Sequence, residues 1–130
     1  MIHLPRPEGM PPTNGYSHAV VASGEVVVVS GQLPADTEGR LVGDGDPLAQ
    51  ARQVFANLAR ALTAAGSDVS HLVRLGFFLT DLADLGAVRT ARTEFLGDAP
   101  EPASSLVQVA GLVLPGARLE IDALAVRRAH

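Results

Sequence analysis

The 130-residue sequence predicts an α+β fold with the element order β-β-α-β-α-β-β. Three observations support this prediction. Short runs rich in β-branched and aliphatic residues are typical of strands. Two longer segments repeat apolar residues at helical spacing, and residues that favour turns stand between the segments. Because helices alternate with strands, we expect one sheet with two helices on one face, whose other face needs a partner or water.

The N-terminal part of the chain predicts a lead-in followed by two short strands. Residues 1–15 contain four prolines and an Asn-Gly pair, so we expect an extended segment that ends in a turn. Residues 16–31 then predict two strands, with Ser23 and Gly24 as the connecting turn. The second strand contains an unbroken valine run at 26–29, which predicts burial on both of its faces.

The clearest element is a helix that begins after Asp46. This aspartate suits the N-cap, and Pro47 suits the first turn. Gly66 is expected to end the helix, which gives an amphipathic helix of about five turns. Asn57 is expected to tie this helix to neighbouring backbone rather than to contact a ligand. The apolar face is formed by Leu48, Ala51, Val54, Phe55, Leu58, Leu62 and Ala65.

The second half of the chain predicts a strand, a helix and two further strands. Residues 71–79 form the strand, and Asp81 with Asp84 opens a helix that runs to about Leu96. Acidic side chains at this end interact favourably with the helix dipole. The final strands are expected at 104–110 and 117–126. All elements belong to a single domain, 1–130.

Composition limits the chemistry and the partners. The chain has no cysteine, which excludes disulfides and thiolate chemistry, and all ten basic residues are arginine, which excludes a lysine Schiff base. A net charge of −4 without any basic stretch argues against nucleic-acid and membrane partners. The histidines show no metal-ligand spacing, so we expect no metal and no cofactor. With no signal peptide or membrane-spanning run, the expected location is cytoplasmic.

Beyond these patterns, six segments stand out along the chain. They are GYSHAV, VSGQLP, QARQVFANLARALTAAG, FFLTDLADL, PASS and LEIDALAV. In their order and approximate spacing they resemble the RidA family, also called YjgF, and the resemblance covers about residues 12–126. It implies a chorismate-mutase-like fold, a homotrimer packed through its sheets, and a small-molecule ligand in clefts between subunits. The family's best-known activity is the hydrolysis of reactive enamines and imines, such as 2-aminoacrylate, to a 2-oxo acid and ammonia.

The resemblance breaks at one position of the implied site. The family motif Pro-Ala-Arg-Ser supplies an arginine that holds the substrate carboxylate through two hydrogen bonds. Here the motif reads Pro102, Ala103, Ser104, Ser105, so Ser104 replaces that arginine. A carboxylate without a cationic partner is costly to desolvate, so we expect the usual substrate to bind poorly. The Ser104 hydroxyl suits a neutral group better, although a purely structural serine at the strand start remains an alternative.

The resemblance also implies the other site residues. Glu120 is the expected catalytic residue, which positions water, while Tyr16 lines the cleft and Gly31 offers backbone groups. Arg89 and Arg92 stand where the family commonly has asparagine and often has an aromatic residue. One of them, Arg89 first, is a candidate to replace the missing charge. The alternatives are surface arginines, a packing tyrosine, a turn glycine, and a glutamate on an ordinary half-exposed strand.

The resemblance implies a RidA-like hydrolase for enamines, imines or related reactive carbonyl compounds, and Ser104 leads us to expect an altered substrate class. The alternative is a trimeric metabolite-binding protein that keeps the cleft without the chemistry. A ribonuclease or translation inhibitor ranks last, because an acidic chain with one tyrosine and no basic patch is poorly equipped to bind phosphates.

Overall fold

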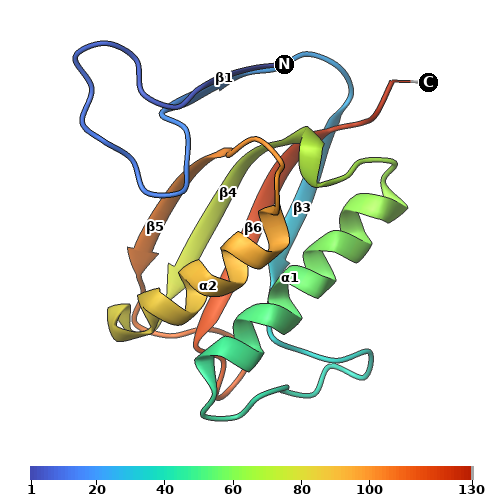
Figure 1. The fold of residues 1–130 in the computed structure, drawn as a ribbon. Helices are drawn as coiled ribbons and strands as arrows, with labels where there is room; N and C mark the ends of the chain where they lie inside the picture. The colour runs from blue at the N-terminus through green and yellow to red at the C-terminus, as the bar shows by residue number, and fades with distance from the viewer. Residues whose placement is uncertain (130) are drawn as a thin grey trace.

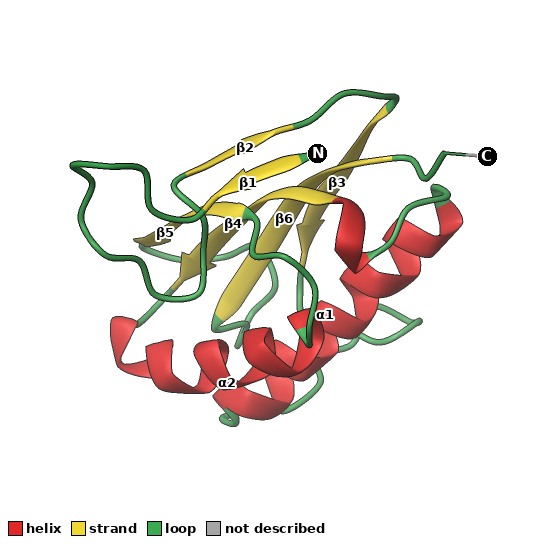
Figure 2. Ribbon diagram, turned by 45° about the horizontal axis from the view of Figure 1, so that its top comes forward, coloured by secondary structure: helices red, strands yellow, loops and turns green. Residues whose placement is uncertain are grey.

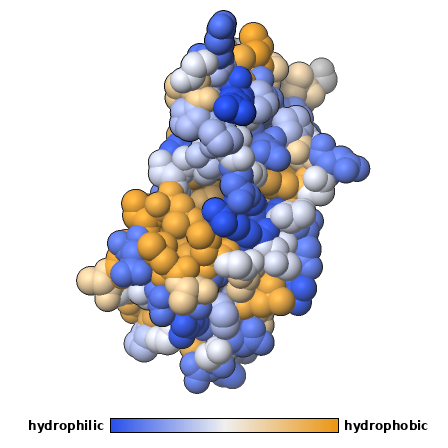
Figure 3. Space-filling model, turned by 60° about the vertical axis from the view of Figure 1, so that its left-hand side comes forward, coloured by the Kyte–Doolittle hydropathy of each residue, from blue (hydrophilic) through white to orange (hydrophobic). Residues whose placement is uncertain are grey.

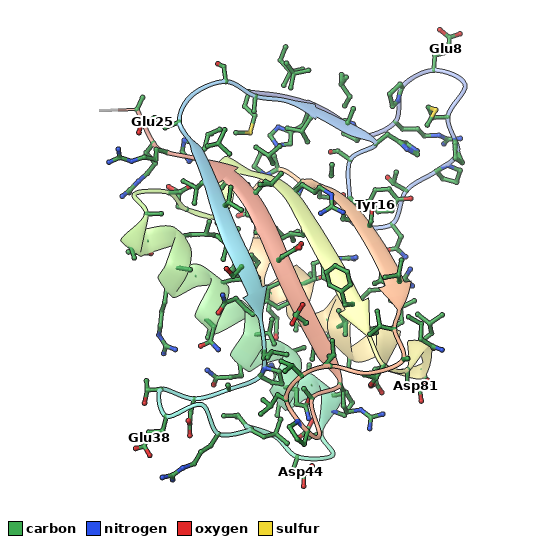
Figure 4. The ribbon with its side chains drawn as sticks, turned by 180° about the vertical axis from the view of Figure 1, so that it is seen from behind. Glu8, Tyr16, Glu25, Glu38, Asp44 and Asp81 are labelled. Carbon is green, nitrogen blue, oxygen red and sulfur yellow. The ribbon has the colours of Figure 1, made fainter. Side chains whose placement is uncertain are left out.

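A computed structural model describes residues 1–129. Its main feature is a four-stranded sheet with the strand order β3-β6-β4-β5. Two helices lie on one face of this sheet (Figure 1), and the opposite face is uncovered (Figure 4). The predicted α+β fold is therefore confirmed. The bounds are β3 Val26–Gln32, α1 Pro47–Ala64, β4 Leu72–Leu79, α2 Leu85–Leu96, β5 Ala103–Gln108 and β6 Leu119–Val126.

The pairing of the strands follows from their connections. β6 lies antiparallel between β3 and β4, whereas β4 and β5 are parallel. Parallel neighbours need a long crossover, and α2 provides it, since it lies between β4 and β5 in the chain. The register of β3 and β6 shifts between Val29 and Gln32, so that Gly31 lies in an irregular part of the edge strand.

The core lies between the sheet and the two helices. As predicted, the Asp46 side chain caps α1 by accepting a hydrogen bond from the Ala49 N–H at 3.0 Å. Gly66 follows the helix with φ +78°, a conformation that favours glycine. Asn57 donates to the carbonyls of Leu33 (3.2 Å) and Ala35 (2.9 Å), which confirms its predicted structural role. The largest fully buried apolar side chains include Val54, Leu58, Leu62, Leu72, Leu75, Leu79, Val88, Leu119 and Ile121.

The prediction for the valine run is wrong in the single chain. Val27 and Val29 are buried at 7% and 6% exposure, whereas Val26 and Val28 are 68% and 74% exposed. The helices cover only one face of β3, so alternate side chains of the strand point to the uncovered face. The valine run therefore gives β3 an apolar side chain on each face of the sheet, and the helices of this chain cover only one of these faces.

The N-terminal lead-in holds a strand that the sequence analysis missed. β1 (Ile2–Leu4) pairs antiparallel with β2 (Ala19–Val21) in a separate two-stranded sheet (Figure 2). The pair closes the loop of residues 5–18. Ser17 attaches this loop to the start of β5, because its N–H donates to the Pro102 carbonyl (3.0 Å) and its hydroxyl to the Glu101 carbonyl (2.7 Å).

Candidate functional site

A pocket of ≈ 260 Å³ lies between α2, β5 and the loop that precedes β2. We call it the helix-face pocket, because it opens on the side of the sheet that carries the helices. It brings together three of the predicted site residues, Tyr16, Arg89 and Ser104. Its lining residues include arginines but no acidic residue. They are Asn14, Tyr16, Phe77, Leu85, Arg89, Arg92, Ser104 and Leu106.

The strand register explains why Ser104 faces this pocket. Ser104 is the parallel partner of Leu75, which is buried beneath the helices at 1% exposure. Residues in register share a face of the sheet, so Ser104 points to the helix side and Ser105 to the uncovered side. Leu106 pairs with Phe77 in the same way, and these two side chains line the apolar part of the pocket.

Tyr16 reaches the pocket because its neighbour is fixed. Ser17 is buried at 1% exposure and binds the backbone just before β5. Figure 4 shows Tyr16 on the loop beside the start of that strand. The tyrosine ring meets the His18 ring edge to face, with the centroids 5.9 Å apart. The loop therefore adds Tyr16 to the pocket, whereas the other aromatic lining residue, Phe77, belongs to strand β4 of the sheet.

Two arginines of α2 supply the charge of the pocket. Arg92 is half-buried, and its two terminal nitrogens donate to Asn14, to the main-chain oxygen at 3.3 Å and to Oδ1 at 3.4 Å. Gly15, at φ +75°, makes room for this guanidinium, since any Cβ there would collide with it. Burial and, after it, the charge of exposed Arg89 lower the pKa of Arg92. Among residues 1–129, neither arginine forms an ion pair.

The remaining predicted residues, Gly31 and Glu120, lie together on the other side of the sheet. Glu120 alternates with buried Leu119 and Ile121, so its side chain points to the uncovered face. A Cβ at residue 31 would lie 2.5 Å from Cδ and Oε2 of Glu120, which shows how closely the carboxylate passes the glycine. We call these two residues the sheet-face pair.

The structure thus divides the five predicted site residues into two groups on opposite faces. Within one chain the carboxylate of Glu120 does not line the pocket that holds Ser104. Four further lining residues were not predicted from the sequence, namely Asn14, Phe77, Leu85 and Leu106. The only signal for Asn14 was the turn-forming Asn-Gly pair, and nothing local connects it with Arg92, 78 positions away. The described residues contain no cluster of side chains suited to a metal ion.

Comparisons with known proteins cover most of the chain. A family model described as Endoribonuclease L-PSP matches residues 7–127. Protein DfrA of Myxococcus xanthus is 44% identical over 112 residues, which are 85% of this chain and 84% of DfrA. A 2-iminobutanoate/2-iminopropanoate deaminase of Salmonella typhimurium is 38% identical, with 81% and 82% of the two chains covered. A Yersinia pestis structure of the Rid protein family superposes with a TM-score of 0.87 at 37% identity, covering 95% and 96%.

Proposed function

Because the chain belongs to the RidA (YjgF) family, whose model is described as Endoribonuclease L-PSP, we propose that it hydrolyses small enamines or imines in clefts between the subunits of a homotrimer. The deaminase name of the Salmonella relative supports this reaction class. The observation that carries the proposal is the position of Arg89, which shares one pocket with Ser104 and Tyr16. A cation is thus present beside the residue that replaced the family arginine.

A shared site accounts for the division of the predicted residues. The uncovered sheet face exposes Val26, Val28 and Val107, at 68%, 74% and 48% exposure, so it offers apolar surface for a second subunit. Figure 3, which brings the β5 side of the molecule forward, shows a broad hydrophobic area on this side. In the proposed trimer the sheet-face pair of one subunit completes the helix-face pocket of its neighbour. Each cleft then holds the residues that one chain keeps apart.

The chemistry needs only water as a second reactant. An enamine first takes a proton from solvent on carbon and becomes an iminium ion. The Glu120 carboxylate then accepts a proton from water, whose oxygen bonds to the iminium carbon while the C=N π electron pair moves to nitrogen. Glu120 returns the proton to nitrogen and the C–N bond breaks, so that ammonia leaves. The hydroxyl group loses its proton to solvent as the carbonyl forms, which balances the proton taken up in the first step. Gly31 keeps the space that the carboxylate occupies.

The substrate class follows from the charges in the pocket. Ser104 donates or accepts one hydrogen bond and holds no carboxylate by a salt bridge. Arg89 and Arg92 lie on α2, across the pocket from β5. An anionic group of the substrate therefore binds toward the helix, and a neutral carbonyl, amide or hydroxyl group lies against Ser104. The usual 2-imino acid is expected to be a poor substrate.

The direct test is the rate of ammonia release from 2-aminoacrylate, which a dehydratase generates from serine in the same vessel. The protein is expected to accelerate release, with a high KM because the carboxylate lacks its usual partner. Glu120→Gln should abolish the acceleration, whereas Glu38→Gln, at an exposed loop residue, should not change it. Failure of the wild-type protein on 2-aminoacrylate and on neutral imines would overturn the proposal.

A second candidate is a trimeric metabolite-binding protein without catalysis. It is favoured by one observation, the serine at position 104, where the resemblance implies an arginine. Ligand binding in the pocket together with unchanged ammonia release would support this candidate. A ribonuclease has less support, because the chain has a net charge of −4. Any RNA effect that depends on phosphate contacts must weaken steeply as the salt concentration rises.

A further inference from the structure

We propose that Arg89 and Arg92 form a binding site for a small dianionic group, either a phosphate monoester or a pair of carboxylates, and that this group defines the substrate class. This inference rests on the proposed function and concerns the same pocket. The two arginines are three residues apart on α2, so they are neighbours on one helix face. Both line the helix-face pocket. The site is thus a pair of guanidinium groups that face one cavity.

The two guanidinium groups on the α2 wall of the pocket favour two negative charges over one. Within one chain no acidic residue lines the pocket, and neither arginine forms an ion pair among the described residues, although the charge of Glu101 acts on Arg92. In the proposed cleft, Glu120 of the neighbouring subunit serves the reacting end of the substrate and not the end that lies against α2. A monoanion would compensate one guanidinium and leave the other in a partly desolvated setting. A dianion compensates both, and phosphate and carboxylate oxygens fit the planar donor fork of arginine. The mutual repulsion of the arginines, which contributes to the lowered pKa of Arg92, is then relieved.

The two arginines differ in how firmly the protein holds their guanidinium groups. Asn14 and the space above Gly15 hold Arg92 in place, so little conformational entropy is lost when a ligand binds it. Arg89 is exposed, and its guanidinium has no hydrogen-bond partner in residues 1–129. All of its donors are therefore free for a ligand. Arg92 provides a fixed cation, and Arg89 closes on the ligand from the next turn of the helix.

The rest of the pocket indicates what the dianionic group is attached to. Phe77, Leu85 and Leu106 form an apolar lining beside the arginines, while Ser104 and Tyr16 offer hydroxyl groups. Such a lining suits a short carbon chain that carries a neutral carbonyl or imine at one end. Within one chain the pocket has a volume of ≈ 260 Å³, which suits a small metabolite. The substrate is therefore a short-chain imine or enamine whose anionic end lies against α2.

The experiment is calorimetric titration of the full-length protein with simple anions at pH 7.5 and constant ionic strength. Phosphate, malonate and succinate serve as dianions, and acetate and chloride as monoanions. We expect at least one dianion to bind about tenfold or more tightly than acetate, because it forms additional charge-assisted hydrogen bonds. If phosphate binds tightly and malonate weakly, the ligand class is a phosphate ester. If malonate binds tightly and phosphate weakly, the ligand class is a dicarboxylate.

Matched variants distinguish anion binding by Arg89 and Arg92 from a general effect of the protein's charge. Arg89→Gln should weaken the dianion about tenfold or more and leave acetate nearly unchanged. Arg92→Lys removes the hydrogen bonds to Asn14 but keeps the positive charge, so it should retain part of the preference for dianions over acetate. This variant separates loss of the loop contact from loss of the binding site. Arg40→Gln removes an exposed arginine elsewhere and should change nothing. Equal affinity for malonate, phosphate and acetate in the wild type would overturn the inference, as would an Arg89→Gln variant with wild-type affinities.

These outcomes are distinct from failure of the proposed function. Dianion preference without ammonia release would leave the binding site intact and refute the hydrolase. Ammonia release without dianion preference would leave the hydrolase intact and refute the dianion site. The two measurements use the same protein preparation, so each conclusion has its own readout.

Discussion

Ser104 and Arg89 lie on two walls of one pocket, the first on strand β5 and the second on helix α2. A serine cannot carry the charge that the resemblance implies at position 104, and in the proposed function an arginine on the opposite wall supplies it. The charge then has a different position, so we expect an anionic substrate to bind in a different orientation. On this proposal, the specificity of the site depends on which wall carries the cation.

The first prediction moves the charge back to the strand. Ser104→Arg alone should improve 2-aminoacrylate hydrolysis only slightly, because the new guanidinium meets Arg89 and Arg92 in the same pocket. Combined with Arg89→Asn, it should lower KM by about tenfold or more, as expected for a charge-assisted pair. Steady-state kinetics of the two single variants and the double variant measures the coupling between the two substitutions. If the effects of the single substitutions on KM simply add in the double variant, the prediction is contradicted.

The second prediction concerns the space beside Glu120, the proposed catalytic carboxylate. Gly31→Ala places a methyl group where Glu120 now lies, 2.5 Å from its Cδ. The carboxylate must shift, so kcat should fall roughly tenfold to hundredfold. Gly111→Ala is the control, because a Cβ there meets no atom within 4 Å. An unchanged kcat for Gly31→Ala would show that the position of Glu120 is not critical.

At the level of elements, the helices and main strands were predictable because their signals are local. Asp46 caps α1 and Gly66 follows it, and both can be read from neighbouring residues. β1 was not predictable, since its partner β2 is distant in sequence and prolines dominate the segment between them. The exposure of Val28 was not predictable either, because it depends on which face the helices cover.

The third prediction tests the cap of the longest helix. Asp46→Ala removes the acceptor of the Ala49 N–H and should lower the free energy of unfolding by about 1 kcal/mol. Asp44→Ala is the matched control, since Asp44 is an exposed aspartate that precedes the helix and does not cap it. Urea unfolding of both variants gives the comparison. Equal loss of stability in both variants would assign the effect to net charge instead of capping.

For the whole molecule, the sequence could name five candidate site residues but not their arrangement. The resemblance supplied Glu120 and Gly31 together with Tyr16 and Ser104, while the fold places the two pairs on opposite faces of the sheet. Contacts that join distant segments, such as Arg92 with Asn14, carry no local signal. The helices cover only one face of the sheet, and the proposed trimer accounts for both the divided candidate residues and the exposed valines, because a second subunit would cover the other face. Neither helix of the described residues has the length and apolar character that a membrane crossing requires.

The fourth prediction tests association through the uncovered face. Val28 is 74% exposed in the single chain, so Val28→Glu should leave the fold of the subunit intact. A charge buried between subunits without a partner is strongly unfavourable, so the variant should be monomeric and inactive. Light scattering gives the mass, and Thr63→Glu, on the exposed side of α1, is the control. A trimeric Val28→Glu variant would place the interface elsewhere.

The most direct test of the account is to mix two impaired variants. Glu120→Gln keeps the helix-face pocket and Arg89→Gln keeps the sheet-face pair, so mixed trimers contain some clefts with both intact halves. With random exchange at equal amounts, about a quarter of the clefts should be native, and ammonia release should rise to about that share of the wild-type rate. Activity that stays at the level of the separate variants after verified subunit exchange would contradict a site shared between subunits.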